Sequence, residues 1–130
     1  MTQEEKQLLL TDLCARLPYG VKCAIFDNKL PFAASHGKYA FKMDAISIEE
    51  NEIDVWLEKG NFNIETIKPY LRPMSSMTEE EKDTFQGFIY PACNDPVSMI
   101  NWLNAHHFDY RSLIEKGLAL EAKDGMYKTE

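Results

Sequence analysis

Cysteine, basic residues and long apolar runs are all scarce in this sequence. The three cysteines are odd in number and form no Cys-x-x-Cys pair, which favours a reducing cytoplasm over secretion. No apolar run approaches the roughly 20 residues that a membrane-spanning helix needs, and the acidic N-terminus has no apolar signal segment. We therefore expect a cytoplasmic protein without a membrane partner.

The shortage of basic residues sets the sign of the surface charge. Lysine and arginine number 14 against 21 aspartates and glutamates, which gives a formal net charge of -7. A field of this sign repels nucleic-acid phosphates unless a local basic cluster overcomes it. The sequence has no such cluster, which disfavours a nucleic-acid partner.

The residues that are present can build a core. Of the 130 residues, 45% are hydrophobic and 12% aromatic, which lies outside the range of disordered chains. The length suits one domain that buries a core without disulfides or metals. The sequence contains no internal repeat, low-complexity tract or domain boundary.

The first part of the chain has the pattern of a helix followed by a strand. Thr2 and Glu5 form a capping box, and leucines recur four residues apart at positions 9, 13 and 17. The period then changes to two over residues 21–25. We predict a helix over residues 3–16 and a half-buried strand after it.

A β-hairpin with an irregular first strand is predicted around a turn at residues 50–51. The apolar side chains move from odd to even positions after Met43, which predicts a bulge at residues 44–45. The turn then places the apolar side chains at positions 46, 48, 53 and 55 on one face. Trp56 falls on the opposite face, where it either packs under a helix or forms an exposed contact.

Further along the chain, proline and capping residues mark the remaining elements. Pro69 and Pro73 favour an extended edge strand or connector. Thr78 begins a short acidic helix, and Asp95 with Pro96 begins another.

The C-terminal region is predicted to turn a corner into a second helix. Asp109 suits the cap of that helix, and Gly117 suits the left-handed conformation at its end. The Asp-Gly pair at 124–125 then predicts a short hairpin.

Together these patterns predict a single α+β domain over residues 1–130. We expect an N-terminal helix and an antiparallel sheet of three to five strands, followed by a C-terminal helix-corner-helix and a short hairpin. The first helix and the C-terminal pair are expected to cover the same face of the sheet.

Two strings in the sequence are distinctive: Ile67 to Glu81, and Asn104 to Ala122 followed by Gly125 to Tyr127. Two strings near the start, Glu4 to Leu10 and Leu13 to Gly20, belong with them. In them the chain resembles an uncharacterised family of small proteins from gut Bacteroidales genomes and their phages. Ser112 stands where the family pattern leads us to expect glycine. The resemblance implies a phage or mobile-element origin and no established activity, so it transfers no catalytic residue.

His106 and His107, close to Asp109, are the residues most suggestive of a metal or acid-base site. Consecutive residues near a helix end point about 100° apart, so the two imidazoles cannot easily share a metal without a bend. We interpret one histidine as a cap on helix carbonyls and the other as solvated.

No cysteine has the setting of a nucleophile, which needs a nearby base and a lowered pKa. Cys23 falls on the predicted buried face, Cys14 on the packed stripe of the first helix, and Cys93 in a loop. The sequence also lacks a phosphate-binding loop, a metalloprotease motif and a nucleophile elbow. We predict no catalytic residue, no metal, no cofactor and no enzymatic activity.

By elimination, the sequence favours a protein-interaction or regulatory accessory protein, whose partner is another protein or a second copy of the chain. One alternative is a small-ligand-binding or sequestering protein that antagonises host defence. Another is a divergent winged-helix protein whose second C-terminal helix and hairpin contact DNA. The candidate interaction residues are Trp56, Tyr70, Trp102, His106, His107 and Arg111.

Overall fold

The computed structural model describes residues 1–26, 40–58, 60–89 and 95–127. Cys93, predicted in a loop, lies outside these residues. The elements are α1 (Gln3–Arg16), η1 (Leu17–Tyr19), β1 (Lys22–Ile25), β2 (Phe41–Glu49), β3 (Glu52–Leu57), β4 (Gly60–Asn63), η2 (Ile64–Thr66), β5 (Ile67–Leu71), η3 (Met74–Ser76), α2 (Glu79–Ile89), α3 (Pro96–Ala105) and β6 (Leu120–Glu121). The protein is therefore of the predicted α+β class, with an N-terminal helix.

Helix α1 begins and ends where the sequence predicts. The Thr2 hydroxyl accepts a hydrogen bond from the Glu5 amide at 3.0 Å, and the Glu5 carboxylate accepts one from the Thr2 amide at 2.8 Å. This reciprocal pair satisfies two amides that the first turn leaves free. Leu9 and Leu13 are fully buried, so the helix packs through the predicted leucine stripe.

The strands form one mixed sheet in the order β4-β3-β2-β1-β5-β6. All neighbours are antiparallel except β5 and β6, which pair in parallel through Tyr70 and Leu120 and through Leu71 and Glu121. The sequence prediction of an antiparallel sheet with three to five strands is corrected to six strands and one parallel pair. The last strand has only two residues, too short for a periodic pattern to reveal.

The β2–β3 hairpin has the predicted register. Ile46 lies opposite Val55 and Ile48 opposite Ile53, and the register shifts between Met43 and Ala45. That shift is the predicted bulge, which keeps Met43 and the later apolar residues on one face. Met43 is buried there, whereas Ile48, near the end of the hairpin, is 59% exposed.

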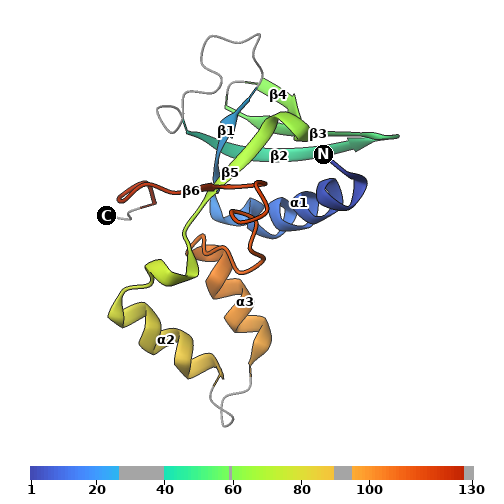
Figure 1. Cartoon of the computed structure of the whole chain (residues 1–130). Coiled ribbons are helices and arrows are strands. Elements are labelled where there is room, and N and C mark those ends of the chain that lie inside the picture. Colours follow the sequence, from blue (N-terminus) through green and yellow to red (C-terminus); the bar gives the residue numbers. More distant parts are fainter. Residues whose placement is uncertain (27–39, 59, 90–94, 128–130) are drawn as a thin grey trace.

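The buried apolar side chains form two clusters. The larger lies between α1 and the sheet and includes Leu13, Val55 and Leu71. The smaller consists of Met77, Leu103 and Phe108, with partly buried neighbours from α2 and α3. Figure 1 shows the corresponding arrangement: α1 runs along one face of the sheet, and α2 and α3 extend away from it as a pair.

The second helix of the predicted C-terminal pair is absent. Residues 109–117 form successive turns, although the Asp109 carboxylate does accept hydrogen bonds from the amides of Leu113 and Ile114 at 2.8 and 3.0 Å. Ser112 interrupts helical geometry with a φ of 61°, a left-handed conformation in which glycine carries the least steric cost. The partner of α3 is instead α2.

The predicted C-terminal hairpin is also wrong within the described residues. The amide of Met126 donates to the Lys123 carbonyl at 3.0 Å, and Gly125 has a φ of 84°, so the Asp-Gly turn exists. However, β6 pairs only with β5, in parallel. Within residues 120–127 the chain therefore reverses without a second antiparallel strand.

Candidate functional site

The side of the β2–β3 hairpin opposite the core has an exposed tryptophan at its centre. Trp56 is 43% exposed, which answers the question that the sequence left open. Its indole Nε1 donates a hydrogen bond to the Ser47 hydroxyl at 3.1 Å. The hydrogen bond holds the ring over β2 while the aromatic surface stays accessible to solvent.

The residues around Trp56 are small or acidic. Ala45 and Asn61 lie opposite Trp56 on the two flanking strands, Asp54 lies opposite Ser47, and Glu52 lies opposite Glu49. Because paired residues and alternate residues share one side of a sheet, these side chains form one surface. We call it the Trp56 face and define it by Ala45, Ser47, Glu49, Glu52, Asp54, Trp56 and Asn61.

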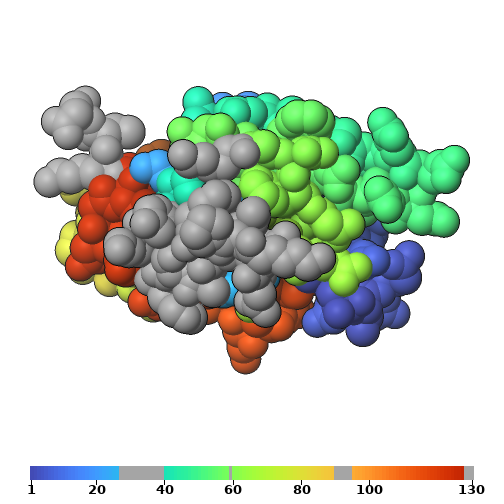
Figure 2. All heavy atoms as spheres, turned by 90° about the horizontal axis from the view of Figure 1, so that it is seen from above, coloured from blue at the N-terminus to red at the C-terminus, as the bar shows by residue number. Residues whose placement is uncertain are grey.

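In the part of the chain that the structure describes, no ion pair includes a carboxylate of the Trp56 face. The pairs are Lys6–Glu65, Asp12–Arg16, Asp12–Arg111, Arg72–Glu81 and Glu79–Lys82. Glu49 and Glu52 nevertheless occupy directly opposed positions, where like charges destabilise a sheet. Figure 2 shows the end of this hairpin projecting from the body of the molecule.

Trp102, in contrast, is part of the smaller apolar cluster. Its ring lies 5.6 Å from that of Phe108 and 6.4 Å from that of Phe85, stacked on both. Tyr70 is only 2% exposed. Tyr70 is therefore corrected from a candidate interaction residue to a core residue, and the Trp102 ring packs α3 against its neighbours.

The two adjacent histidines have different surroundings. His106 contacts the Trp102 carbonyl through Nδ1 at 2.9 Å, which confirms the predicted cap on a helix carbonyl. His107 is 7% exposed, so its predicted solvation is wrong. Its ring stacks on Tyr127 with centroids 3.6 Å apart, and its φ is 64°.

The surroundings of His107 disfavour its charged form. Burial, followed by the positive charges of Arg16, His106, Arg72 and Lys22, lowers the pKa of His107 to about 4. The imidazole is therefore neutral near pH 7 and makes no ion pair with the described residues. Among the described residues, no group of three or more histidine, cysteine, aspartate or glutamate side chains is arranged to hold a metal ion.

Arg111 belongs to a buried ionic network that sequence reasoning missed. The Asp12 carboxylate accepts from Arg16 Nε at 2.8 Å and from Arg111 Nη1 at 2.9 Å. Arg16 Nη2 also donates to the Phe108 carbonyl at 2.6 Å. Asp12 and Arg16 are both fully buried, and their four-residue spacing on a predicted helix was the available signal. This network fastens α1 to the chain after α3.

Tyr127 fastens the C-terminal end to the sheet. Its hydroxyl accepts from the Lys22 amide at 2.8 Å and donates to the Tyr70 carbonyl at 2.7 Å. Burial raises the pKa of this hydroxyl, so it stays protonated at neutral pH and able to donate. Sequence reasoning also missed this contact, because the partners lie on different strands far from residue 127.

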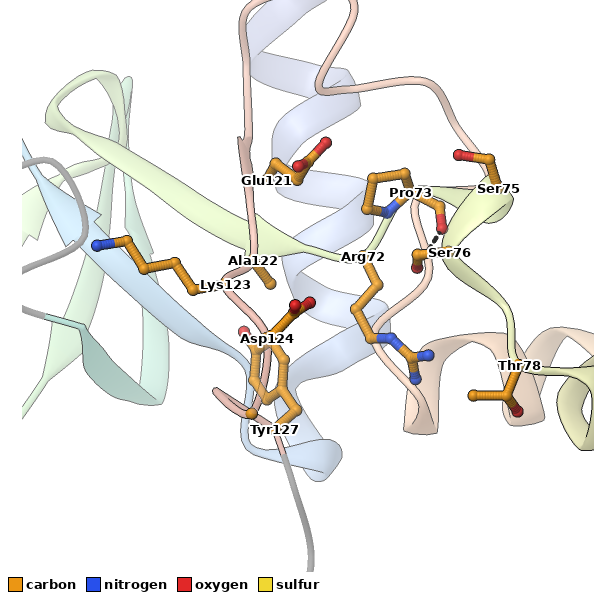
Figure 3. A pocket seen from close by; sticks show the side chains of 11 residues that line it. Arg72, Pro73, Ser75, Ser76, Thr78, Glu121, Ala122, Lys123, Asp124 and Tyr127 are labelled. Atoms are coloured by element: carbon orange, nitrogen blue, oxygen red, sulfur yellow. Dashed lines mark hydrogen bonds between the residues drawn. The ribbon is translucent and has the colours of Figure 1, made fainter.

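A polar cavity of about 780 Å³ lies between two segments, residues 72–78 and residues 121–127. Figure 3 shows Asp124 and Tyr127 on one side and Pro73 and Ser76 on the other, with Lys123 extending away from Arg72. The Arg72 guanidinium is held by both oxygens of Glu81, at 2.6 and 2.8 Å, and this lowers the pKa of Glu81. The full lining is Arg72, Pro73, Ser75, Ser76, Thr78, Glu121, Ala122, Lys123, Asp124, Gly125 and Tyr127.

The two described cysteines differ from each other in burial. Cys23 is fully buried, as predicted, and burial raises the pKa of its thiol, which opposes nucleophilic character. Cys14 is exposed, so its predicted place on the packed stripe is wrong. Partial burial raises its pKa as well.

Comparison with known proteins found no matching family model, curated protein or solved structure. Within the described residues, no helix combines the length and apolar character that a membrane crossing requires. The fold and the site therefore define this protein only as an α+β protein with an acidic sheet face centred on an exposed tryptophan.

Proposed function

We propose that this protein is a non-enzymatic interaction protein whose partner, another protein, docks on the Trp56 face. The observation that carries the proposal is the 43% exposure of Trp56 on β3, which is second in the order of the sheet. Tryptophan is enriched among the residues that dominate binding at protein interfaces. Its hydrogen bond to Ser47 supports the proposal, because a ring that is already positioned loses little side-chain entropy on binding.

The test is a comparative pull-down with three forms of the protein. We expect a partner that binds the wild type, is lost with Trp56→Ala and is retained with Val97→Ala. Val97 is 68% exposed on α3, so the second variant removes apolar surface of a different region. A partner captured equally by all three forms, or by none, contradicts docking on the Trp56 face.

The polar cavity supports a second candidate, the binding of a small polar ligand. Its volume of about 780 Å³ lies within the range of roughly 300–1,000 Å³ typical of ligand sites. Its lining residues include an arginine, a lysine, two carboxylates and four hydroxyl side chains. A ligand with both donors and acceptors would suit this mixture.

A thermal-shift screen with nucleotides, sugars, amino acids and divalent metals tests the second candidate. A ligand that binds the folded protein raises its melting temperature. We expect Ala122→Phe, which fills part of the cavity, to abolish the shift. A shift that Ala122→Phe leaves unchanged places the ligand elsewhere, and no shift across the panel removes the support for this candidate.

The winged-helix alternative is not proposed. It requires a recognition helix after residue 109 and a following hairpin. Residues 109–117 form turns, and β6 pairs in parallel with β5, so neither element is present in residues 95–127.

A further inference from the structure

Three described lysines and the carboxylates of the Trp56 face lie at different positions on the sheet. Lys22 and Lys42 lie opposite each other on β1 and β2, and Lys68 lies opposite Ala24 on β5. The other end of β2 and its continuation into β3 carry Glu49, Glu52 and Asp54 instead. Among the described residues, none of these three lysines forms an ion pair with a carboxylate of the Trp56 face.

Two of these lysines are also engaged elsewhere. Lys22 Nζ donates to the Met126 carbonyl at 3.1 Å, and Lys68 Nζ lies 5.1 Å from the centre of the Phe26 ring. The excess negative charge of the Trp56 face is thus not neutralised by the described part of the chain. A ligand that supplies cations would relieve the repulsion between Glu49 and Glu52.

Trp56 adds a second reason for a cationic ligand. The negative face of an indole ring attracts ammonium and guanidinium groups, most strongly among the aromatic side chains. The indole N–H is already used by Ser47, so the ring offers its face and edge rather than a hydrogen-bond donor. An exposed ring on the same side of the hairpin as three carboxylates is a surface for lysine or arginine.

We infer that the Trp56 face binds a lysine- or arginine-rich segment of a partner protein. One cationic side chain lies over the Trp56 ring, and its neighbours pair with Glu49, Glu52 and Asp54. This inference rests on the proposed interaction function and specifies the chemistry of the partner. Charge complementarity of this kind speeds association and excludes acidic competitors.

The test is a calorimetric titration with a lysine-rich peptide, and with the same peptide after every lysine is replaced by glutamate. We expect binding of the first peptide alone, and weaker binding as the ionic strength rises. The double variant Glu49→Gln, Glu52→Gln should weaken it by roughly two- to fivefold for each charge removed. Trp56→Ala should weaken it by about fivefold or more.

The matched control is Glu80→Gln with Asp83→Asn on α2, because both residues are exposed and the net charge changes by the same amount. If this control loses as much affinity as the hairpin variant, the attraction is that of the whole molecule and the inference is wrong. Absence of binding at low salt, in variants and wild type whose circular dichroism shows them folded, also overturns it.

Failure of this inference is distinguishable from failure of the proposed function. The discriminating result is a partner in the pull-down that requires Trp56 and yet binds equally at all salt concentrations and to the glutamate variants. That result agrees with the interaction function and contradicts a basic segment in the partner. A second copy of this chain as the Trp56-dependent partner contradicts both the basic segment and the docking of another protein, and sedimentation of the purified protein identifies it.

Discussion

Two groups of charges in this protein have opposite surroundings. Asp12, Arg16 and Arg111 lie between α1 and the chain after α3, where the Asp12 carboxylate is shared by two guanidinium groups. Glu49 and Glu52 lie opposite each other on the exposed hairpin. The first group is paired because a buried charge without a partner is costly. The second can stay unpaired because water screens it, and it is therefore available to a partner.

The largest expected effect is a loss of stability when the buried group, rather than the exposed one, loses a carboxylate. Asp12→Ala leaves Arg16 and Arg111 without their carboxylate, and we expect a loss of about 3–5 kcal/mol in unfolding free energy. Asp54→Asn on the hairpin should change it by less than about 0.5 kcal/mol. Urea unfolding of both variants measures the difference, and similar losses for the two would refute the contrast.

His107 extends the comparison to pH, because it is a buried ionisable group that has no counter-ion in the described part of the chain. Its pKa is about 4 in the folded protein against an ordinary value of 6.5. Between these values the unfolded chain binds a proton that the folded protein does not, so stability falls as the pH falls from 6.5 towards 4. The expected slope from this group is at most about 1.4 kcal/mol per pH unit.

The variant His107→Asn isolates that slope, since asparagine tolerates the positive φ of this position. Unfolding free energies measured at several pH values should show a shallower dependence in His107→Asn than in the wild type. His106→Asn removes the neighbouring imidazole as a control. Equal slopes in the wild type and His107→Asn would show that His107 does not cause the pH dependence.

Tyr127→Phe extends the comparison to a buried hydroxyl that forms hydrogen bonds without a charge. The change leaves the Lys22 amide and the Tyr70 carbonyl without the hydroxyl that joins them, while the ring can still stack on His107. We expect a loss of about 1–3 kcal/mol in thermal or urea unfolding. Tyr19→Phe, at a position 37% exposed, is the control, and an equal effect there would contradict a special role for Tyr127.

The smallest expected effect lies on the exposed hairpin. Glu52→Lys converts the like-charged pair with Glu49 into an attractive one, and we expect a gain of about 0.2–1 kcal/mol. The gain should shrink as salt is added. Glu115→Lys makes the same charge change at an exposed position outside the sheet. A melting temperature that rises equally in both variants would indicate a general charge effect instead.

Local sequence patterns determined the structural features that depend on residues close together in the chain. The capping box at Thr2, the bulge after Met43 and the register of Ile46 with Val55 each depend on neighbours along the chain or on a short hairpin. The same alternation placed Trp56 on the outer face. Period and capping are local physical effects, so the sequence alone determined them.

Only the tertiary structure decided which polar groups meet. Asp12 and Arg111 are 99 positions apart, and Tyr127 and Lys22 are 105 apart. The burial of Tyr70 and His107, and the turns that replace a helix after Asp109, depend on packing against such distant segments. No local pattern encodes these contacts, because the free energy of burying a polar group is set by the partners that the whole fold provides.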